Sequence, residues 1–113
     1  MANGYYELKK GASGKFSFVL KAGNHEVILT SQSYDSKAST EGGIDSVRRH
    51  GPEAKNFEKK SSSASQPYFV LKSSNGQIVG TSEMYSSESA RDNGIASVQT
   101  NSPSTTIKDS TAA

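Results

Sequence analysis

The chain has 113 residues, a net charge of +2 and no cysteine. This length is typical of one domain, and the lack of cysteine excludes disulfides and thiolate chemistry. Residues 1–53 and 54–113 each carry a net charge of +1, so a basic tail for nucleic acid is not indicated. The first residues do not resemble a signal peptide, and no run reaches the roughly 18 apolar residues of a membrane span. We therefore expect a soluble cytoplasmic protein with no membrane association.

Most of the chain is an internal duplication with an offset of 51 residues. Segment 18–52 aligns without a gap to segment 69–103, and 14 of the 35 positions are identical. The offset extends upstream, where Glu7 aligns with Glu58. Solenoids and propellers generally need three or more repeats. Two units of about fifty residues therefore predict one domain with pseudo-twofold symmetry.

Three strands are predicted at the start of the first copy. A weakly alternating strand over 5–10 is followed by a turn at 11–14, where two glycines tolerate positive φ. The clearest strand is 15–21, because its apolar residues recur at period two. A third strand is predicted over 26–32.

A tight hairpin joins the second and third strands. In the second copy its turn is Asn75-Gly76, the strongest short signal for a type I′ turn. The first copy has His25 where the second has Gly76, which predicts left-handed backbone geometry at His25, a conformation that histidine visits more often than most residues. We prefer this turn role to a catalytic role for His25.

A helix is predicted after the third strand, because the apolar period changes there. Asp35 or Ser36 is the expected N-cap in the first copy, and Ser86 or Ser87 in the second. Each helix is expected to end before the proline that follows it.

Glycines stand at the same place in both predicted helices, at Gly43 and Gly94. A glycine inside a helix costs about 1 kcal/mol relative to alanine. Its recurrence suggests that the helix approaches the sheet closely at this point.

The middle strands carry apolar residues on both faces. Those on the face opposite Phe18 are Val19, Ile28, Tyr68, Val70 and Val79. If the helices cover only one face, these residues would form an exposed patch. Either the sheet curls on itself or a second subunit covers it, which favours a homodimer.

No arrangement with catalytic or metal-binding spacing is evident. His25 and His50 are 25 residues apart without cysteine or clustered carboxylates, whereas zinc needs three or four ligands. A Gly-x-Ser-x-Gly elbow is also missing. The equivalent Glu7 and Glu58 could form a carboxylate dyad, but strand-edge glutamates beside lysines are the simpler interpretation. We predict no catalytic, cofactor-binding or metal-binding residue.

Basic residues give a second, weaker hypothesis. Lys21 and Lys72 are equivalent in the two copies, and Arg48 and Arg49 lie near the end of the first helix. Together with five tyrosines they could contact nucleic acid. Basic groups at a helix C-terminus also complement the helix dipole, which needs no ligand.

The repeated motifs resemble those of the YegP-like family of small bacterial proteins. They are Phe-Val-Leu-Lys-x-x-Asn, Thr-Ser-x-x-Tyr-x-Ser, and Gly-Ile-x-Ser-Val followed by proline, and the resemblance runs from Gly4 to about Asp109. It implies tandem βββα repeats in an α+β domain. It implies no activity, ligand or catalytic residue.

These observations predict a single α+β domain over residues 1–113, with two tandem βββα repeats, an antiparallel sheet and both helices on one face. Repeat one covers about 5–53 and repeat two about 56–104; Ile107 is expected in a short strand, before a flexible tail at about 108–113. The favoured function is a small non-enzymatic binding module for a protein or peptide, as a homodimer. The alternative is nucleic-acid binding through Lys21, Lys72, Arg48 and Arg49.

Overall fold

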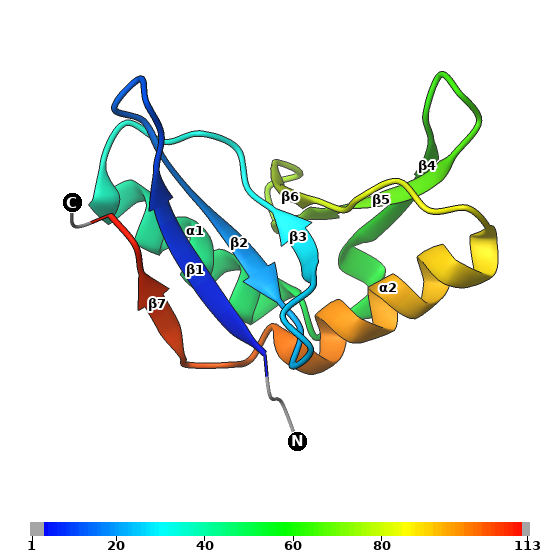
Figure 1. The fold of residues 1–113 in the computed structure, drawn as a ribbon. Coiled ribbons are helices and arrows are strands. Elements are labelled where there is room, and N and C mark those ends of the chain that lie inside the picture. Colours follow the sequence, from blue (N-terminus) through cyan, green and yellow to red (C-terminus); the bar gives the residue numbers. More distant parts are fainter. Residues whose placement is uncertain (1–3, 112–113) are drawn as a thin grey trace.

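The computed structural model describes residues 4–111. Residues 1–3 and 112–113 lie outside the described residues. Residues 112–113 are the end of the predicted tail. Figure 1 shows the elements, which are β1 (Tyr5–Lys10), β2 (Phe16–Lys21), β3 (Val27–Thr30), α1 (Lys37–His50), the 3-10 helix η1 (Ala54–Asn56), β4 (Phe57–Ser61), β5 (Pro67–Lys72), β6 (Ile78–Thr81), α2 (Glu88–Asn101) and β7 (Ile107–Asp109). The order strand–strand–strand–helix occurs twice, so the chain has the α+β fold that the sequence predicted.

The strands of residues 4–111 form one sheet in the order β4-β5-β6-β3-β2-β1-β7. Neighbouring strands are antiparallel, except that β7 runs parallel to β1. The two copies meet where β3 pairs with β6 through Thr30 and Thr81. These threonines are equivalent in the two repeats. The pseudo-twofold axis expected from the duplication therefore passes through this pair.

Each α-helix has 14 residues and begins after a serine N-cap. Ser36 Oγ accepts a hydrogen bond from the N–H of Ser39 at 3.1 Å, and Ser87 Oγ accepts one from the N–H of Ala90 at 3.0 Å. Each bond satisfies a donor that the first turn of a helix leaves open. Within residues 4–111, neither helix is both long enough and apolar enough to cross a membrane.

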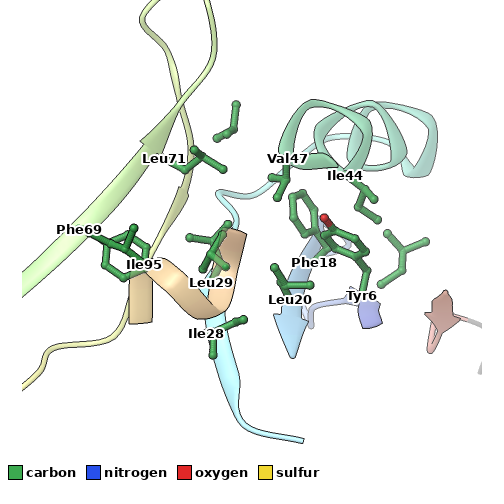
Figure 2. Close-up of a cluster of buried hydrophobic side chains, with 13 residues drawn as sticks. Tyr6, Phe18, Leu20, Ile28, Leu29, Ile44, Val47, Phe69, Leu71 and Ile95 are labelled. Atoms are coloured by element: carbon green, nitrogen blue, oxygen red, sulfur yellow. The ribbon is translucent and has the colours of Figure 1, made fainter. Parts of the chain in front are cut away.

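Both helices pack on the same face of the sheet, and each contacts strands of both copies. α1 contacts β2, β5 and β6, and α2 contacts β2, β3 and β5. In Figure 2, Phe18 and Tyr6 lie below α1, while Leu29 lies between α2 and the strand that carries Leu71. The two repeats therefore share one hydrophobic core.

The two helix glycines lie at close contacts with aromatic rings. A Cβ added at Gly43 would lie 2.9 Å from Cζ of Tyr34, and one added at Gly94 would lie 2.7 Å from Cζ of Tyr85. Real Cβ atoms do not approach other atoms so closely. The close approach of helix to sheet that the recurrent glycines predicted is confirmed.

The left-handed backbone predicted for His25 is confirmed, whereas the type I′ turn predicted at Asn75-Gly76 is wrong, because Asn75 does not have the positive φ that this turn requires. His25 has a φ of 69°, and its equivalent Gly76 has a φ of 83°. The hydroxyl of Tyr5 lies 3.0 Å from Nδ1 of His25. His25 therefore has a structural role in the turn between β2 and β3.

The prediction of an exposed apolar patch on the far face of the sheet is wrong. Register shifts leave Ile28 and Val79 unpaired in β3 and β6, and such bulges re-aim side chains; both residues join the core on the helix side. Val19 and Val70 stay on the far face but are only 7% and 3% exposed, and Tyr68 is half-buried. No second subunit is needed to cover these residues, so the homodimer loses its original basis.

Candidate functional site

The four cations predicted for nucleic-acid contact do not form one free patch. Lys21 Nζ lies 2.8 Å from Oε1 of Glu7 across β2 and β1, and Lys72 makes the equivalent ion pair with Glu58. Hydrogen bonds from Lys21 and, next, from Ser110 hold the pKa of the Glu7 carboxyl below its ordinary value. The hydrogen bond from Lys72 lowers the pKa of Glu58 in the same way. Both lysines therefore have partners within the chain.

Arg48 is also engaged within the chain. Its Nη1 lies 3.0 Å from Oδ1 of Asp45, and its Nε donates to the carbonyl oxygen of Ser104 at 2.8 Å. Its guanidinium lies 5.4 Å from the centre of the Tyr6 ring. Arg49 is exposed on α1. Since three of the four cations are internally paired, the nucleic-acid alternative gains no support from their placement.

Glu7 and Glu58 do not form a dyad, because they lie far apart in the sheet. Glu7 is on β1 and Glu58 is on β4, and the strands β2, β3, β6 and β5 lie between them.

His50 has a structural role: its Nδ1 donates to the carbonyl oxygen of Ser46 at 2.8 Å, and its Nε2 accepts from the N–H of Ser74 at 3.3 Å. Among residues 4–111, no three His, Cys, Asp or Glu side chains gather in a way that could hold a metal ion.

The two outer strands of the duplicated sheet differ in a way that the sequence did not suggest. The outer edge of β1 is covered by the C-terminal segment, which lies beside it in Figure 1. The N–H of Tyr6 donates to the carbonyl oxygen of Thr106 at 3.0 Å, and the N–H of Ser110 donates to the carbonyl oxygen of Leu8 at 2.8 Å. Tyr6 and Leu8 are fully buried. Residues 106–110 therefore cover the outer edge of β1 in the first copy. They include the start of the predicted tail.

The equivalent strand β4 ends the sheet on the other side and has no strand beside it among the described residues. Its Phe57 is half-buried and its Lys59 is exposed, whereas the equivalent residues of β1 are buried. The N–H of Phe57 bonds to the carbonyl oxygen of Ala54 in η1. By analogy with β1, the outward backbone groups are those of Phe57 and Lys59. Lys59 has no backbone partner outside the ladder to β5 in the described part of the chain.

A hollow of about 620 Å³ adjoins the start of β4. In the first copy this region contains Tyr5, whose ring packs edge-on against His25 with the ring centres 5.8 Å apart. The second copy has the smaller Asn56 and Gly76 at these positions, and both line the hollow together with Lys72. The hollow therefore follows from two substitutions of large rings by small residues.

A second hollow, of about 300 Å³, lies between β4 and α2. Ala54, Phe57 and Ile95 provide its apolar wall, and Lys59 and Asp92 complete the lining. Lys59 Nζ lies 3.3 Å from Oδ1 of Asp92, and the hydrogen bond from Lys59 lowers the pKa of Asp92. β4 thus combines open backbone groups with two hollows, which is an arrangement that suits an extended peptide with alternating side chains.

A comparison of the two copies could have indicated this site from the sequence. Three of the differing pairs lie at this site, namely Tyr5 and Asn56, Leu8 and Lys59, and His25 and Gly76. Each difference replaces a larger or more apolar residue of the first copy by a smaller or more polar one in the second. The sequence does not reveal that β7 covers β1 rather than β4, because that depends on the path of the chain after α2.

Comparison with known proteins supports the duplication and the resemblance. The family model described as a domain of unknown function (DUF1508) matches twice, over residues 12–58 and 62–109. A UPF0339 protein YegP of Yersinia pestis is 52% identical over 111 residues, which are 98% of this chain and 99% of that protein. The YegP protein of Escherichia coli K12 is 51% identical over 108 residues, or 96% of this chain and 98% of that protein. The resemblance inferred from the motifs is confirmed.

Two solution NMR structures share the fold. A UPF0339 protein from Shewanella oneidensis matches with a TM-score of 0.91 and 52% identity, covering 96% of this chain and 92% of that one. The yegP protein of Escherichia coli, titled a protein of unknown function, matches with a TM-score of 0.93 and 50% identity, covering 100% and 97%.

Proposed function

The chain belongs to the DUF1508 family, and on that premise we propose that it is a small non-enzymatic binding module that takes an extended segment of another protein beside β4. The related proteins carry names that state no activity, so the proposal depends on the geometry of this chain.

The difference between β1 and β4 supports this proposal. The chain itself adds a parallel strand to β1 through backbone hydrogen bonds. The equivalent edge of β4 has no strand beside it in residues 4–111, and there the N–H of Phe57 bonds to Ala54 of η1 while that of Lys59 faces outward. Strand addition to an open sheet edge is a common mode of peptide recognition, in which backbone bonds give affinity and hollows for side chains give specificity.

The charge of β4 favours a foreign segment over a second copy. If two β4 strands paired antiparallel about Lys59, two lysines would face each other directly. Like charges at directly opposite positions destabilise a strand pair, and edge lysines commonly prevent sheets from joining edge to edge. The homodimer predicted from the sequence remains a prediction, and light scattering during size-exclusion chromatography measures it.

Selection of short random peptides displayed on phage tests the proposed function. Lys59→Pro removes the outward N–H, and proline is tolerated on edge strands where that N–H faces solvent. Lys59→Thr is the matched control, because it also loses the ion pair with Asp92 but keeps the N–H. We expect peptides enriched on the native protein to bind Lys59→Thr and to fail on Lys59→Pro, with both variants folded by circular dichroism. Equal binding to both variants, or no enrichment at all, would contradict the proposal.

A further inference from the structure

The hairpin turns of the two copies have an asparagine at the same position, Asn24 in the first copy and Asn75 in the second. Oδ1 of Asn24 accepts a hydrogen bond from the N–H of Glu26 at 3.1 Å. Oδ1 of Asn75 accepts the equivalent bond from the N–H of Gln77, also at 3.1 Å. Such a bond folds the asparagine side chain back beside the peptide bond that follows it.

An asparagine held in this way can react with its own main chain. The backbone nitrogen of the next residue loses its proton to hydroxide and attacks Cγ, so that a bond forms between this nitrogen and Cγ. The bond from Cγ to Nδ2 breaks, and Nδ2 leaves as ammonia after taking a proton from water. Water then opens the resulting five-membered succinimide ring at one of its two carbonyl groups. The product is either aspartate or isoaspartate, in which the main chain continues through the side-chain carboxyl group.

Two features of the second turn favour this reaction at Asn75. The next residue is Gly76, which has no side chain to hinder its nitrogen, whereas the first turn has His25 there. The hydroxyl of Ser73 donates a second hydrogen bond to Oδ1 of Asn75, and the equivalent Ala22 has no such donor. Donors placed at this oxygen stabilise the negative charge that develops on it during the attack.

A third difference lies two residues after each asparagine. Nδ2 of Asn24 donates to Oε1 of Glu26 at 2.6 Å, and a carboxylate so close to the reacting group opposes the development of negative charge there. The equivalent residue in the second copy is the neutral Gln77. All three differences therefore make Asn75 more reactive than Asn24.

The backbone hydrogen bond that protects the reacting nitrogen is the same in both turns. The N–H of Gly76 donates to the carbonyl oxygen of Ser73 at 2.9 Å. The N–H of His25 donates to the carbonyl oxygen of Ala22 at the same distance. Both turns are exposed, and hydrogen bonds in exposed loops open readily. This bond therefore does not separate the two asparagines.

Asn93 is also followed by a glycine, but its surroundings differ from those of Asn75. Asn93 and Gly94 lie inside α2, so closure of the five-membered ring would require the backbone to leave the helical conformation and to lose helical hydrogen bonds. Gly94 is also buried against the ring of Tyr85. The fold therefore protects Asn93 and exposes Asn75.

We propose that Asn75 is a site of spontaneous covalent modification in the folded protein, where attack by the nitrogen of Gly76 produces aspartate and isoaspartate. Asn75 lines a hollow of about 350 Å³ between this turn and α1, together with Arg49 and His50. None of the described residues that line this hollow is aspartate or glutamate. Modification therefore introduces a carboxylate into the hollow that Arg49 lines, and isoaspartate also lengthens the main chain of the turn.

The test follows the full-length protein during incubation at physiological temperature and mildly alkaline pH. Trypsin separates Asn24, Asn75 and Asn93 into different peptides, because lysine or arginine residues lie between them. Mass spectrometry measures the conversion of amide to acid in each peptide, and isoaspartyl methyltransferase labels the isoaspartate. We expect Asn75 to be modified about tenfold faster than Asn24 or Asn93, a ratio that corresponds to a barrier difference of about 1.4 kcal/mol.

Matched variants exchange the residues that follow the two turn asparagines. Gly76→His should slow the modification of Asn75 about tenfold, in a left-handed conformation that His25 already adopts at a φ of 69°. His25→Gly should speed the modification of Asn24. Ser73→Ala keeps the backbone of the turn and removes the side-chain donor, so it should slow the reaction at Asn75 severalfold. Circular dichroism checks that each variant is folded.

Unfolding provides the control for the effect of the fold. In concentrated guanidinium chloride, Asn75 and Asn93 should react at similar rates, because both are then asparagine–glycine pairs in an unfolded chain. The proposal is overturned if Asn24 or Asn93 reacts as fast as Asn75 in the folded protein, or if Gly76→His leaves the rate at Asn75 unchanged. A product without isoaspartate would contradict it too, because direct hydrolysis of the amide gives aspartate alone. A difference between Asn75 and Asn93 that persists in guanidinium would show that the fold is not its cause.

Discussion

Adjacent glycines in α1 offer a sharp test of the packing between helix and sheet. Gly42 and Gly43 have the same residue type and the same helical conformation, but their surroundings differ. A Cβ added at Gly42 has no atom within 4 Å, whereas one added at Gly43 meets the hydroxyl and ring of Tyr34 and lies 3.0 Å from Cε2 of Phe18. Each substitution by alanine therefore reports a different balance between the gain in helix propensity and the cost of overpacking.

The structure gives opposite signs for the two variants. Gly42→Ala should raise the free energy of unfolding by about 1 kcal/mol, which is the difference in helix propensity. Gly43→Ala gains the same amount but overpacks the contact, which costs about 1–3 kcal/mol. Tyr34 cannot yield cheaply, because its ring stacks on the buried Phe18 with the ring centres 6.4 Å apart. We expect Gly43→Ala to be about 2 kcal/mol less stable than Gly42→Ala.

Urea unfolding followed by far-UV circular dichroism measures both variants. A change of 1 kcal/mol moves the midpoint by roughly 0.5 M at the slope usual for a protein of this size. Adding Tyr34→Phe to Gly43→Ala removes the nearest atom and should recover part of the loss. The reasoning is refuted if Gly43→Ala is as stable as Gly42→Ala.

Three further predictions concern the first copy. Tyr6→Phe should lower the free energy of unfolding by about 1–2 kcal/mol, because the buried hydroxyl donates to the carbonyl oxygen of Ser102 at 2.6 Å. His25→Gly should be about 1 kcal/mol more stable than His25→Ala, because the φ of 69° suits glycine; thermal unfolding compares them. Glu7→Gln should be less stable than the native protein at neutral pH, because Lys21 lowers the pKa of Glu7 below 4.5. That difference persists above pH 4.5 and disappears as the pH falls through the lowered pKa, which unfolding at a series of pH values measures.

Each of these has a clear contrary result. An unchanged midpoint for Tyr6→Phe would mean that the Ser102 carbonyl finds another donor. If His25→Ala equals His25→Gly, the left-handed turn carries no strain at that position. A stability difference for Glu7→Gln that grows as the pH falls would have the wrong sign for an ion pair with a lowered carboxyl pKa.

Local signals in the sequence were enough to predict the strands and helices and the symmetry of the two copies. The duplication located the strands, the serine N-caps and the left-handed His25, because each depends on neighbours a few residues away. The bulges at Ile28 and Val79 were missed, since a register shift depends on the partner strand. The burial of Val19 was missed for a related reason: it depends on what lies across the sheet.

The candidate site was less predictable than the fold. The pairing of Lys21 and Arg48 within the chain could not be predicted from the sequence, because their partners come from another strand and from the segment after α2. The open edge of β4 arises from the path of residues 104–111, which carry little periodicity. The mismatch between equivalent residues, such as Leu8 and Lys59, is the trace of this edge in the sequence.

The junction of the two copies, where Thr30 of β3 pairs with Thr81 of β6, has a consequence for the origin of the molecule. A single residue pair joins the strands of the two copies there, while each helix rests partly on the strands of the other copy. A single copy would expose the part of its helix that now packs on the strands of the other copy, so two separate copies would bury this surface only by associating. Fusion of the two copies in one chain replaces association at cellular concentration by a tethered encounter. The strand after α2 then made the two halves unequal, because it covers β1 and leaves β4 at the edge of the sheet.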